Sequence, residues 1–355
     1  MVKNGIKKYL KYIPVGCIVL ICLWGFIAYP EKIAEGVRKG LVLSAEKIIP
    51  SLFPFMVFSS CISKTSFFHL ISSKAEKIAQ KFLGISGIGF SSILLGFLGG
   101  YPVGAKGVSD LYSAGHITKN EAQRLFGWCS NPSPAFVISA IGVFTLYSYK
   151  MGIILYLSSV LSAFSIGLFS RFFKDSPTDY IYSPVFIQSK NIFTEAVSET
   201  SETILKICGW LLTFCSISSL IEAVVPYNGL LIFINCISEV TSGCENAVTE
   251  SLSLPVISAI LGFGGFAVIF QVYTYMKNCG IPLRFFICIK ALNGALNAFF
   301  CSVLMKIFPQ SVTASTTITA GNQVFPVSNG IITGIILLIM CTVFVFEVDN
   351  KRRMC

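Results

Sequence analysis

The sequence predicts an all-α polytopic membrane protein with two structural repeats, each containing a glycine-broken re-entrant hairpin and a discontinuous helix. Of the 355 residues, 54% are hydrophobic and 12% are charged, and the mean hydropathy is +0.75. This composition is too apolar for a soluble chain of this length. Glycine and proline interrupt the apolar runs, first at Gly99-Gly100-Tyr101-Pro102 and again at Gly262-Phe263-Gly264-Gly265. Irregular backbone survives at membrane depth only where protein buries it or where it lines a wet cavity.

Charge and cysteine usage exclude several other classes of protein. The net charge of +10 could suggest a nucleic-acid partner, but the basic residues form short clusters beside apolar runs. These clusters are Lys3, Lys7, Lys8 and Lys11; Lys74, Lys77 and Lys81; and Lys351, Arg352 and Arg353. Membrane topology explains them, so the expected partner is the lipid bilayer and not nucleic acid. The 13 cysteines include no CxxC pair, so we expect no metal site, disulfide framework or cofactor.

The N-terminal part, residues 1–40, is expected to hold a retained first span at about Tyr9–Ala28, with its N-terminus in the cytoplasm. The apolar run is long for a signal peptide and no cleavage site follows it. A charged interfacial turn is expected at Glu31–Lys39. The next span, Leu41–Ile62, contains two prolines that should kink it. The segment Phe67–Phe82 alternates apolar and basic residues, which favours a helix on the cytoplasmic surface.

The first repeat is predicted over residues 41–175, with its hairpin near 84–112. Gly99 and Gly100 free the backbone and Pro102 removes a hydrogen-bond donor, so no helix should pass through intact. Lys106 and Asp110 follow within a few residues. Charge so close to a break favours a hairpin whose tip forms part of a binding site.

A discontinuous helix should follow the hairpin. It begins at Thr118, where Thr118-Lys119-Asn120-Glu121 has the pattern of a capping box. The stretch Ser130-Asn131-Pro132-Ser133-Pro134 interrupts it before the apolar run Ala135–Tyr147. A further span, Gly152–Phe169, ends at basic residues and therefore in the cytoplasm.

A polar loop, residues 176–203, should separate the two halves, and the second repeat is predicted over residues 204–347. Its expected spans are Ile204–Val225, Gly229–Val248, Arg284–Phe308 and Val327–Phe346, with a hairpin near 254–280 and a basic tail at 348–355. Within the second of these spans lies Glu239-Val240-Thr241-Ser242-Gly243, a carboxylate beside a small polar interruption.

The two glycine breaks can be aligned in one register. Gly99, Gly100, Lys106 and Gly115 then lie opposite Gly264, Gly265, Gln271 and Gly280. Interrupted apolar segments at matching places in two halves indicate the substrate site of a transporter. Eight crossings would place both termini in the cytoplasm and both hairpins on one side. An inverted repeat would instead require the span Gly229–Val248 to be broken, and the sequence leaves this open.

The predicted substrate-binding residues are Gly99, Gly100, Tyr101, Lys106, Asn131, Gly264, Gly265 and Gln271, and the ion-coupling candidates are Glu239, Thr241 and Ser242. Lys106 could bind an anionic carboxylate, or it could pair with Asp110 one helical turn away. Glu239 is costly at membrane depth, so it should be protonated, paired with a cation, or used as a proton or sodium site. Asn293 and Asn297 are expected to form interhelical hydrogen bonds.

An enzyme is not expected. No serine or cysteine has a histidine or carboxylate at an interpretable spacing, and His69 and His116 show no partner spacing for a metal or a triad. A structural scaffold would not need a glycine-broken hairpin in both halves. A non-transporting structural protein nevertheless stays an alternative.

Several motifs together resemble a known family. They are GFLGGYPVGAKGVSDLY, ITKNEAQRLF, CSNPSP, the EVTSG run, and GFGG with Gln271. They resemble the sporulation integral membrane protein family (YlbJ), over roughly Leu41 to Leu304. Ser130-Asn131-Pro132 departs from the Asn-Asn-Ser form that is more usual at that break in the family.

The resemblance implies a nucleoside-recognition or "gate" type domain and a fold similar to that of concentrative nucleoside transporters. It also implies transport of a small anionic aromatic metabolite, dipicolinic acid, from mother cell to forespore across the outer forespore membrane of a bacterium. A nucleoside or nucleobase is the alternative substrate.

Overall fold

The structure is a computed structural model that describes residues 13–65, 73–173 and 191–308. Within these ranges the chain forms helices and no strand, as predicted. Five described helices are long and apolar enough to cross a membrane, namely Pro30–Ser63, Tyr149–Phe173, Ile192–Val224, Leu254–Cys279 and Leu283–Ile307. The start of the first predicted span, the span Val327–Phe346 and the basic tail lie outside the described residues, so the predicted number of crossings stays a prediction.

Helix α2 (Ile13–Ala28) exposes Trp24 and other large apolar side chains, which suits contact with lipid.

The first long helix, Pro30–Ser63, begins earlier than predicted. Its first part, helix α3 (Pro30–Leu43), occupies the stretch predicted as a charged turn. It continues through the π-helical turn η1 (Ser44–Ile48) into α4 (Ile49–Ser63).

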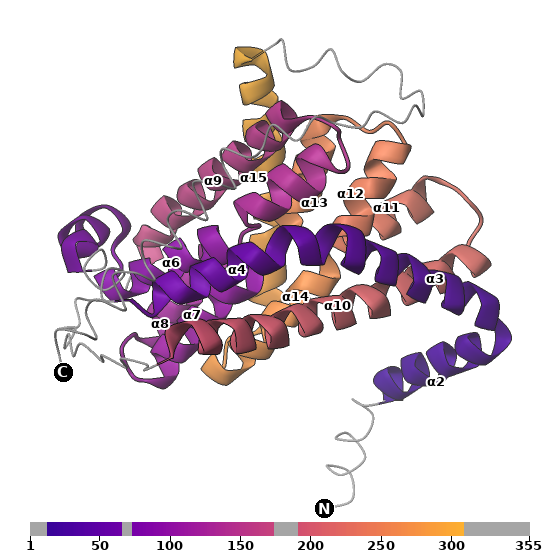
Figure 1. Cartoon of the computed structure of the whole chain (residues 1–355), viewed down its shortest axis with the longest axis horizontal. Helices are drawn as coiled ribbons and strands as arrows, with labels where there is room; N and C mark the ends of the chain where they lie inside the picture. Colours follow the sequence, from indigo (N-terminus) through magenta and orange to yellow (C-terminus); the bar gives the residue numbers. More distant parts are fainter. Residues whose placement is uncertain (1–12, 66–72, 174–190, 309–355) are drawn as a thin grey trace, which may run out of the picture. The chain divides into compact units, whose positions relative to one another are not determined.

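Close packing explains why the predicted turn is helical. A Cβ placed on Gly36 of α3 would lie 2.7 Å from the backbone oxygen of Cys215 in α10 (Ile192–Val224). The small residues of α3 therefore allow the two helices to approach closely, as in other helix pairs of membranes. Figure 1 shows α3 and α4 running beside α10. Residues 192–203, predicted as part of a loop, form the first turns of α10, which corrects that boundary.

Helices α6 (Gly87–Gly99) and α7 (Tyr101–Ser113) form a helical hairpin around Gly100. Gly100 has a φ of +89°, a conformation that glycine adopts without strain. A Cβ on Gly104 would lie 2.7 Å from the Cα of Gly96, so α7 runs back along α6. The predicted break is confirmed, and its re-entrant position in a membrane stays a prediction. Before α6, the helix Ser73–Leu83 meets it at a bend of 93°.

Helices α11 (Gly229–Ser238) and α12 (Val240–Thr249) fold back in the same way around Glu239. A Cβ on Gly243 would lie 2.6 Å from the backbone oxygen of Cys236. Of the two possibilities that the sequence left open for Gly229–Val248, the structure shows the broken one and not a single continuous span. Small residues on both sides of Glu239 let the two helices pack against each other.

Two other helices are interrupted without folding back. Helix α8 (Lys119–Cys129) and the π-helix η3 (Ala135–Val143) flank Ser130–Pro134, as predicted. Helices α13 (Leu254–Phe263) and α14 (Gly265–Met276) flank Gly264 and together form one candidate span. The stretch near 254–280 was predicted as the second hairpin, but it continues onward through its break.

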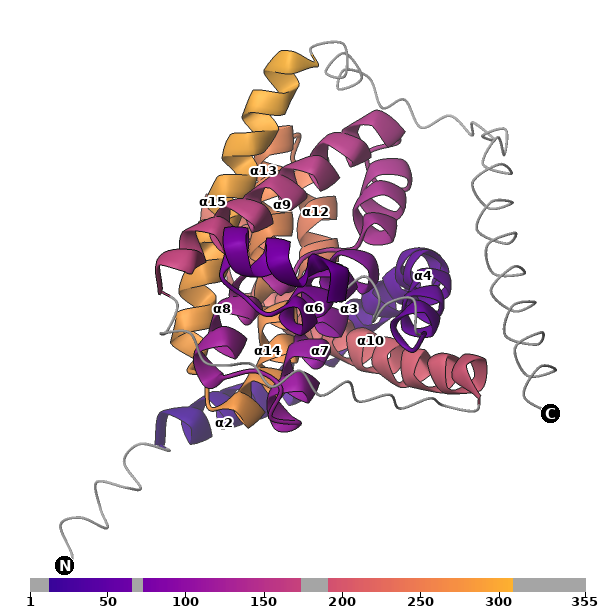
Figure 2. The same ribbon diagram turned by 90° about the vertical axis from the view of Figure 1, so that its left-hand side faces the viewer.

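The spans α9 (Tyr149–Ser170) and α15 (Leu283–Ile307) close the two halves, and α15 packs against both α9 and α13 (Figure 2). Among the described residues, a long helix, a helical hairpin, a broken helix and a span follow one another in this order in each half. This order pairs Gly100 with Glu239, and Ser130–Pro134 with Gly264. The alignment predicted from the glycines instead placed the first hairpin opposite the broken helix of the second half. A glycine marks an unusual φ, but it does not determine whether the chain reverses or continues after it.

Candidate functional site

The interrupted helices meet at their breaks. A Cβ on Gly265 would lie 2.9 Å from the backbone nitrogen of Val240, at the tip of the second hairpin. A Cβ on Gly264 would lie 3.4 Å from the ring of Tyr101, at the tip of the first hairpin. The hydroxyl of Tyr101 donates a hydrogen bond of 2.6 Å to the backbone oxygen of Leu261. The two halves therefore contact each other at their irregular segments.

A small cavity of about 50 Å³ lies at this meeting point and is called the central pocket here. Six of the predicted site residues line it: Gly99, Gly100, Tyr101, Glu239, Thr241 and Gln271. Other lining residues include Ile48 and Leu52 of the first long helix, Ser133 and Phe136 near the break after α8, and Trp210 and Leu211 of α10. The structure thus brings together most of the site predicted from the two halves.

Four helices begin at the central pocket. Its lining contains the first residues of α7 and α12, residues in the first turn of α14, and Ser133 and Phe136 at the start of η3. The first turn of a helix has backbone N–H groups without partners inside the helix, and it carries a partial positive charge. A cavity surrounded by such ends favours a negatively charged group.

Glu239 occupies one of these helix ends. Its side chain is 5% exposed, and its Oε2 accepts a hydrogen bond of 2.7 Å from the backbone nitrogen of Ser242. Glu239 therefore acts as the N-cap of α12, which helps to stabilise a carboxylate away from water. Thr241 and Ser242 are also buried beside it. The three ion-coupling candidates lie together, as their adjacent positions required.

Asn131 does not line the central pocket. It is 1% exposed, its side-chain nitrogen donates to the backbone oxygen of Trp128, and its Oδ1 accepts from Asn293 at 3.4 Å. Asn293 also donates to the backbone oxygen of Gly262 at 3.2 Å. Asn131 thus links the two broken helices outside the pocket. Asn293 and Asn297 form interhelical hydrogen bonds, as predicted, through Ser162 and Ser159 respectively.

Lys290 was not predicted as a site residue, although it lies where three of the breaks meet. It is fully buried, its Nζ donates to the backbone oxygen of Ser130 at 3.1 Å, and it lies 5.1 Å from the ring centre of Tyr101. A periodic signal was present in the sequence. Lys290, Asn293 and Asn297 share one face of a helix, a polar stripe in an otherwise apolar segment.

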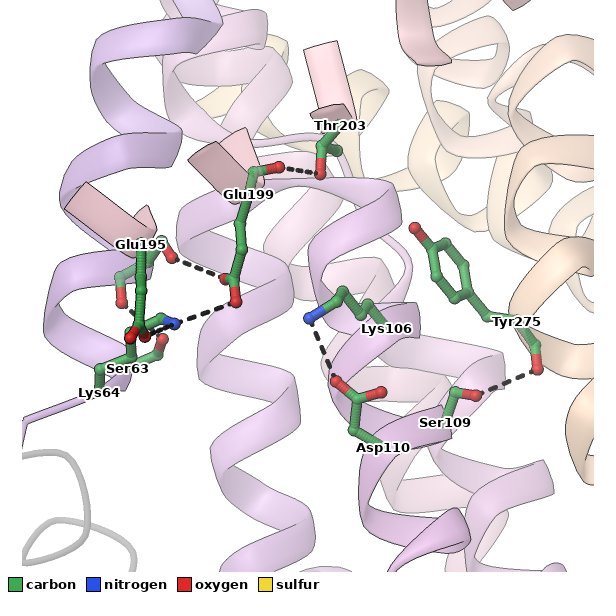
Figure 3. Close-up of polar contacts among 10 residues, drawn as sticks. Ser63, Lys64, Lys106, Ser109, Asp110, Glu195, Glu199, Thr203 and Tyr275 are labelled. Atoms are coloured by element: carbon green, nitrogen blue, oxygen red, sulfur yellow. Dashed lines mark hydrogen bonds and ion pairs between the residues drawn. The ribbon is translucent and has the colours of Figure 1, made fainter. Parts of the chain in front are cut away.

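A second cavity, of about 220 Å³, adjoins the central pocket and is called the vestibule here. Pro102 lines both cavities. Lys106 lies in the vestibule and pairs with Asp110 at 3.3 Å, and the two side chains are 45% and 64% exposed (Figure 3). Of the two predicted roles for Lys106, the structure shows the ion pair, and Lys106 does not line the central pocket.

The other vestibule lysine is paired as well. Lys64, directly after the first span, contacts Glu195 at 3.1 Å and Glu199 at 3.0 Å (Figure 3). Burial acts to lower the pKa of Lys64, but the hydrogen bonds to Glu199 and Glu195 outweigh it and the pKa is raised. Lys64 is therefore fully charged at neutral pH, and its charge is balanced where it lies.

A third ion pair lies on the opposite side of the central pocket. Lys47 pairs with Glu245 and also donates to the hydroxyl of Thr145 at 3.2 Å. Along the first long helix, Lys47 comes first, the pocket residues Ile48 and Leu52 follow, and Lys64 lies at the vestibule. The pocket therefore lies between an open vestibule and a closed ion pair.

Among the described residues, no group of three or more His, Cys, Asp and Glu side chains is placed to hold a metal ion.

Comparisons with known proteins agree with this fold. Residues 45–172 match the Gate family, which is described as nucleoside recognition. The chain is 23% identical to the sporulation integral membrane protein YlbJ of Bacillus subtilis, over 323 residues that cover 79% of each chain. No solved structure matches the chain. The resemblance noted from the motifs is therefore supported: residues 45–172 are similar to the Gate family, and most of the chain is similar to YlbJ.

Proposed function

We propose that the protein is a transporter that carries a small anionic aromatic metabolite through the central pocket. The metabolite proposed is dipicolinic acid, moved from mother cell toward forespore across the outer forespore membrane during sporulation. The observation that carries the proposal is the convergence of four helix N-termini on one pocket inside a membrane bundle. Broken helices whose N-termini face a shared site are the usual way in which transporters bind anionic groups.

The pocket also suits a single aromatic ring. Tyr101, Phe136 and Trp210 line it, and aromatic side chains pack well against the face or edge of another ring. Ring recognition by these residues and charge recognition by the helix ends together favour an aromatic acid.

A path to the pocket supports transport over simple binding. Four helices, α4, α7, α10 and α14, each contribute residues first to the central pocket and then, a few turns away, to the vestibule. A solute that enters the vestibule would therefore reach the pocket along one set of helices. On the other side, the pair formed by Lys47 and Glu245 would have to open for release.

Glu239 supplies a means of coupling. Its carboxylate lines the same pocket and would repel an anionic substrate. A proton or a sodium ion at Glu239, with Thr241 and Ser242 beside it, would remove that repulsion. Binding of the ion would then strengthen binding of the substrate, and the substrate would strengthen binding of the ion by the same factor.

A nucleoside or nucleobase is the second candidate. The Gate family is described as nucleoside recognition. In the pocket, Glu239 and Gln271 could accept and donate hydrogen bonds to a neutral polar ring system, and Trp210 could stack on it. These side chains require no charge on the ligand, so charge dependence separates the two candidates.

The test is uptake by vesicles that contain the purified protein, with labelled dipicolinate and labelled uridine offered separately. We expect uptake of dipicolinate and its loss in Gly100→Val, because Gly100 lines the central pocket and valine would strain the hairpin tip there. Gly115→Val is the matched control, since Gly115 has a similar φ of +75° but does not line the pocket and has no atom near its Cβ position. Uptake of uridine alone would establish the second candidate, and uptake of neither solute would overturn both.

A further inference from the structure

We propose that Lys290 is the cation that binds the carboxylate of the substrate, and that Tyr101 covers this lysine until the substrate arrives. The inference rests on the proposed function and deepens it, because it assigns the charge selectivity of the central pocket to one side chain. It also transfers to Lys290 the role that proximity in sequence suggested for Lys106.

The surroundings of Lys290 are the first step. Its side chain is fully buried, and its contacts are the backbone oxygen of Ser130 at 3.1 Å and the ring of Tyr101. No carboxylate of the described residues lies within 4.0 Å of its Nζ. A buried ammonium with one carbonyl and one ring lacks the opposite charge that normally offsets its desolvation. This arrangement points to a ligand that supplies the missing negative charge.

The position of Tyr101 is the second step. Tyr101 lines the central pocket, which Lys290 does not, and its ring centre lies 5.1 Å from the Nζ of Lys290. Its hydroxyl is held by the backbone oxygen of Leu261 at 2.6 Å. The ring therefore separates the lysine from the cavity, and a change of its rotamer would bring the ammonium to the cavity wall.

Gly264 provides room for that movement. A Cβ at this position would lie 3.4 Å from Cε1 of Tyr101 and 3.6 Å from Cε of Lys290. Without a side chain there, a gap borders both the tyrosine and the lysine. Gly264 also has a φ of +85°, so the break in the second half presents its backbone directly to this gap.

The charges around the pocket fit an acid with two carboxylates. One carboxylate would meet Lys290, and the other would meet the N–H groups at the starts of the surrounding helices. Glu239, the carboxylate that lines the pocket, already accepts a hydrogen bond at Oε2 from the backbone N–H of Ser242. Lys290 thus adds an amine that can carry a full positive charge once a carboxylate of the substrate lies beside it, which the helix ends alone do not provide.

The test compares Lys290→Met with Lys106→Met in the full-length protein. Methionine removes the charge at similar length, and replacing a buried charge by an apolar side chain often preserves the fold. The probes are dipicolinate and its neutral diamide, dipicolinamide. We expect Lys290→Met to weaken dipicolinate binding by about thirtyfold or more, which is about 2 kcal/mol, as for other truncated buried charge partners. Dipicolinamide binding should change by less than about threefold, and Lys106→Met should leave both affinities near wild type.

Two further measurements keep the inference open to refutation. Thermal unfolding checks that Lys290→Met is folded, and Tyr101→Phe tests the cover without touching the lysine. Loss of the hydroxyl frees the ring from Leu261, so dipicolinate should associate faster. Wild-type dipicolinate affinity in folded Lys290→Met, or unchanged association in Tyr101→Phe, would overturn the inference and leave the proposed function standing. A wild-type protein that binds no dipicolinate would overturn both.

Discussion

The vestibule and the central pocket differ in how they handle charge. In the vestibule, Lys106 is paired with Asp110 and both side chains are about half exposed. In the pocket region, Glu239 and Lys290 are buried, and neither has an oppositely charged group within 4.0 Å among the described residues. Glu239 has a helix end as its partner, and Lys290 has a carbonyl and a ring.

This difference separates paired, partly exposed charges from buried charges that have no charged partner. An exposed ion pair contributes about 0–1 kcal/mol, because water solvates both groups almost as well when they are apart. A buried charge without a counterion is costly, and such groups in membrane proteins commonly bind substrates or ions. We therefore expect substitutions to matter in the pocket and at its closed side, and to matter little in the vestibule.

The largest effect is expected from Gly265→Val, at the contact between the two breaks of the second half. Its φ of +76° costs a β-branched side chain about 1–2 kcal/mol. Its Cβ would also lie 2.9 Å from the nitrogen of Val240, which adds about 1–3 kcal/mol of steric strain. Substrate uptake should fall below detection while the protein still inserts. Gly115→Val shares the positive φ without the contact and should retain uptake. Equal loss in both variants would show that backbone strain alone is responsible.

The second effect concerns the ion pair on the closed side of the pocket. Lys47 and Glu245 are only 18% and 24% exposed, so their attraction should exceed that of the vestibule pairs. A double-mutant cycle with Lys47→Met and Glu245→Gln should give a coupling of about 1–3 kcal/mol in thermal unfolding. The same cycle on Lys106 and Asp110 is the control and should give less than about 1 kcal/mol. Similar couplings for the two pairs would remove the distinction between the closed and open sides.

The third effect tests Glu239 as the coupling group. If a proton or sodium ion at Glu239 relieves repulsion of the anion, wild-type affinity for dipicolinate should rise on acidification or on addition of sodium. Protonation or a bound sodium ion neutralises the carboxylate of Glu239, so the repulsion of the anion falls and its affinity rises. Glu239→Gln should have about tenfold higher affinity than wild type at neutral pH, or about 1.4 kcal/mol, and no dependence on either ion. Persisting dependence in the variant would place the coupling ion elsewhere.

The helix breaks could be predicted from sequence because each depends on local chemistry. Gly99-Gly100 before Pro102 predicted the tip of the first hairpin, and Thr118 is the N-cap that the capping pattern predicted, accepting from the backbone nitrogen of Glu121 at 3.1 Å. The direction of the chain after a break could not be predicted in the same way. Chain reversal at Glu239 depends on how closely Gly243 approaches Cys236, and continuation through Gly264 depends on packing against other helices.

The site was predicted in part for a similar reason. Residues at the breaks themselves, such as Gly100 and Glu239, had to lie near one another once the halves met. Lys290 lies in the middle of a long helix, and its depth becomes evident only when α15 is packed against the broken helices. A single lysine in an apolar helix can equally reach toward the membrane surface.

The smallest effect is expected from Lys106→Gln, which the sequence alone placed in the substrate site. Lys106 follows Gly100 by six residues, and a helix rises about 1.5 Å per residue, so it lies about 9 Å from the hairpin tip. There it faces the vestibule and Asp110. Removing its charge should lower dipicolinate affinity less than about fivefold, equivalent to the 0–1 kcal/mol of an exposed pair. The remaining effect should vanish at high salt, since screening reduces attraction between an exposed charge and an approaching anion. A loss of about thirtyfold or more that persists in salt would show that the vestibule lysine binds the substrate, and the contrast between the two cavities would then fail.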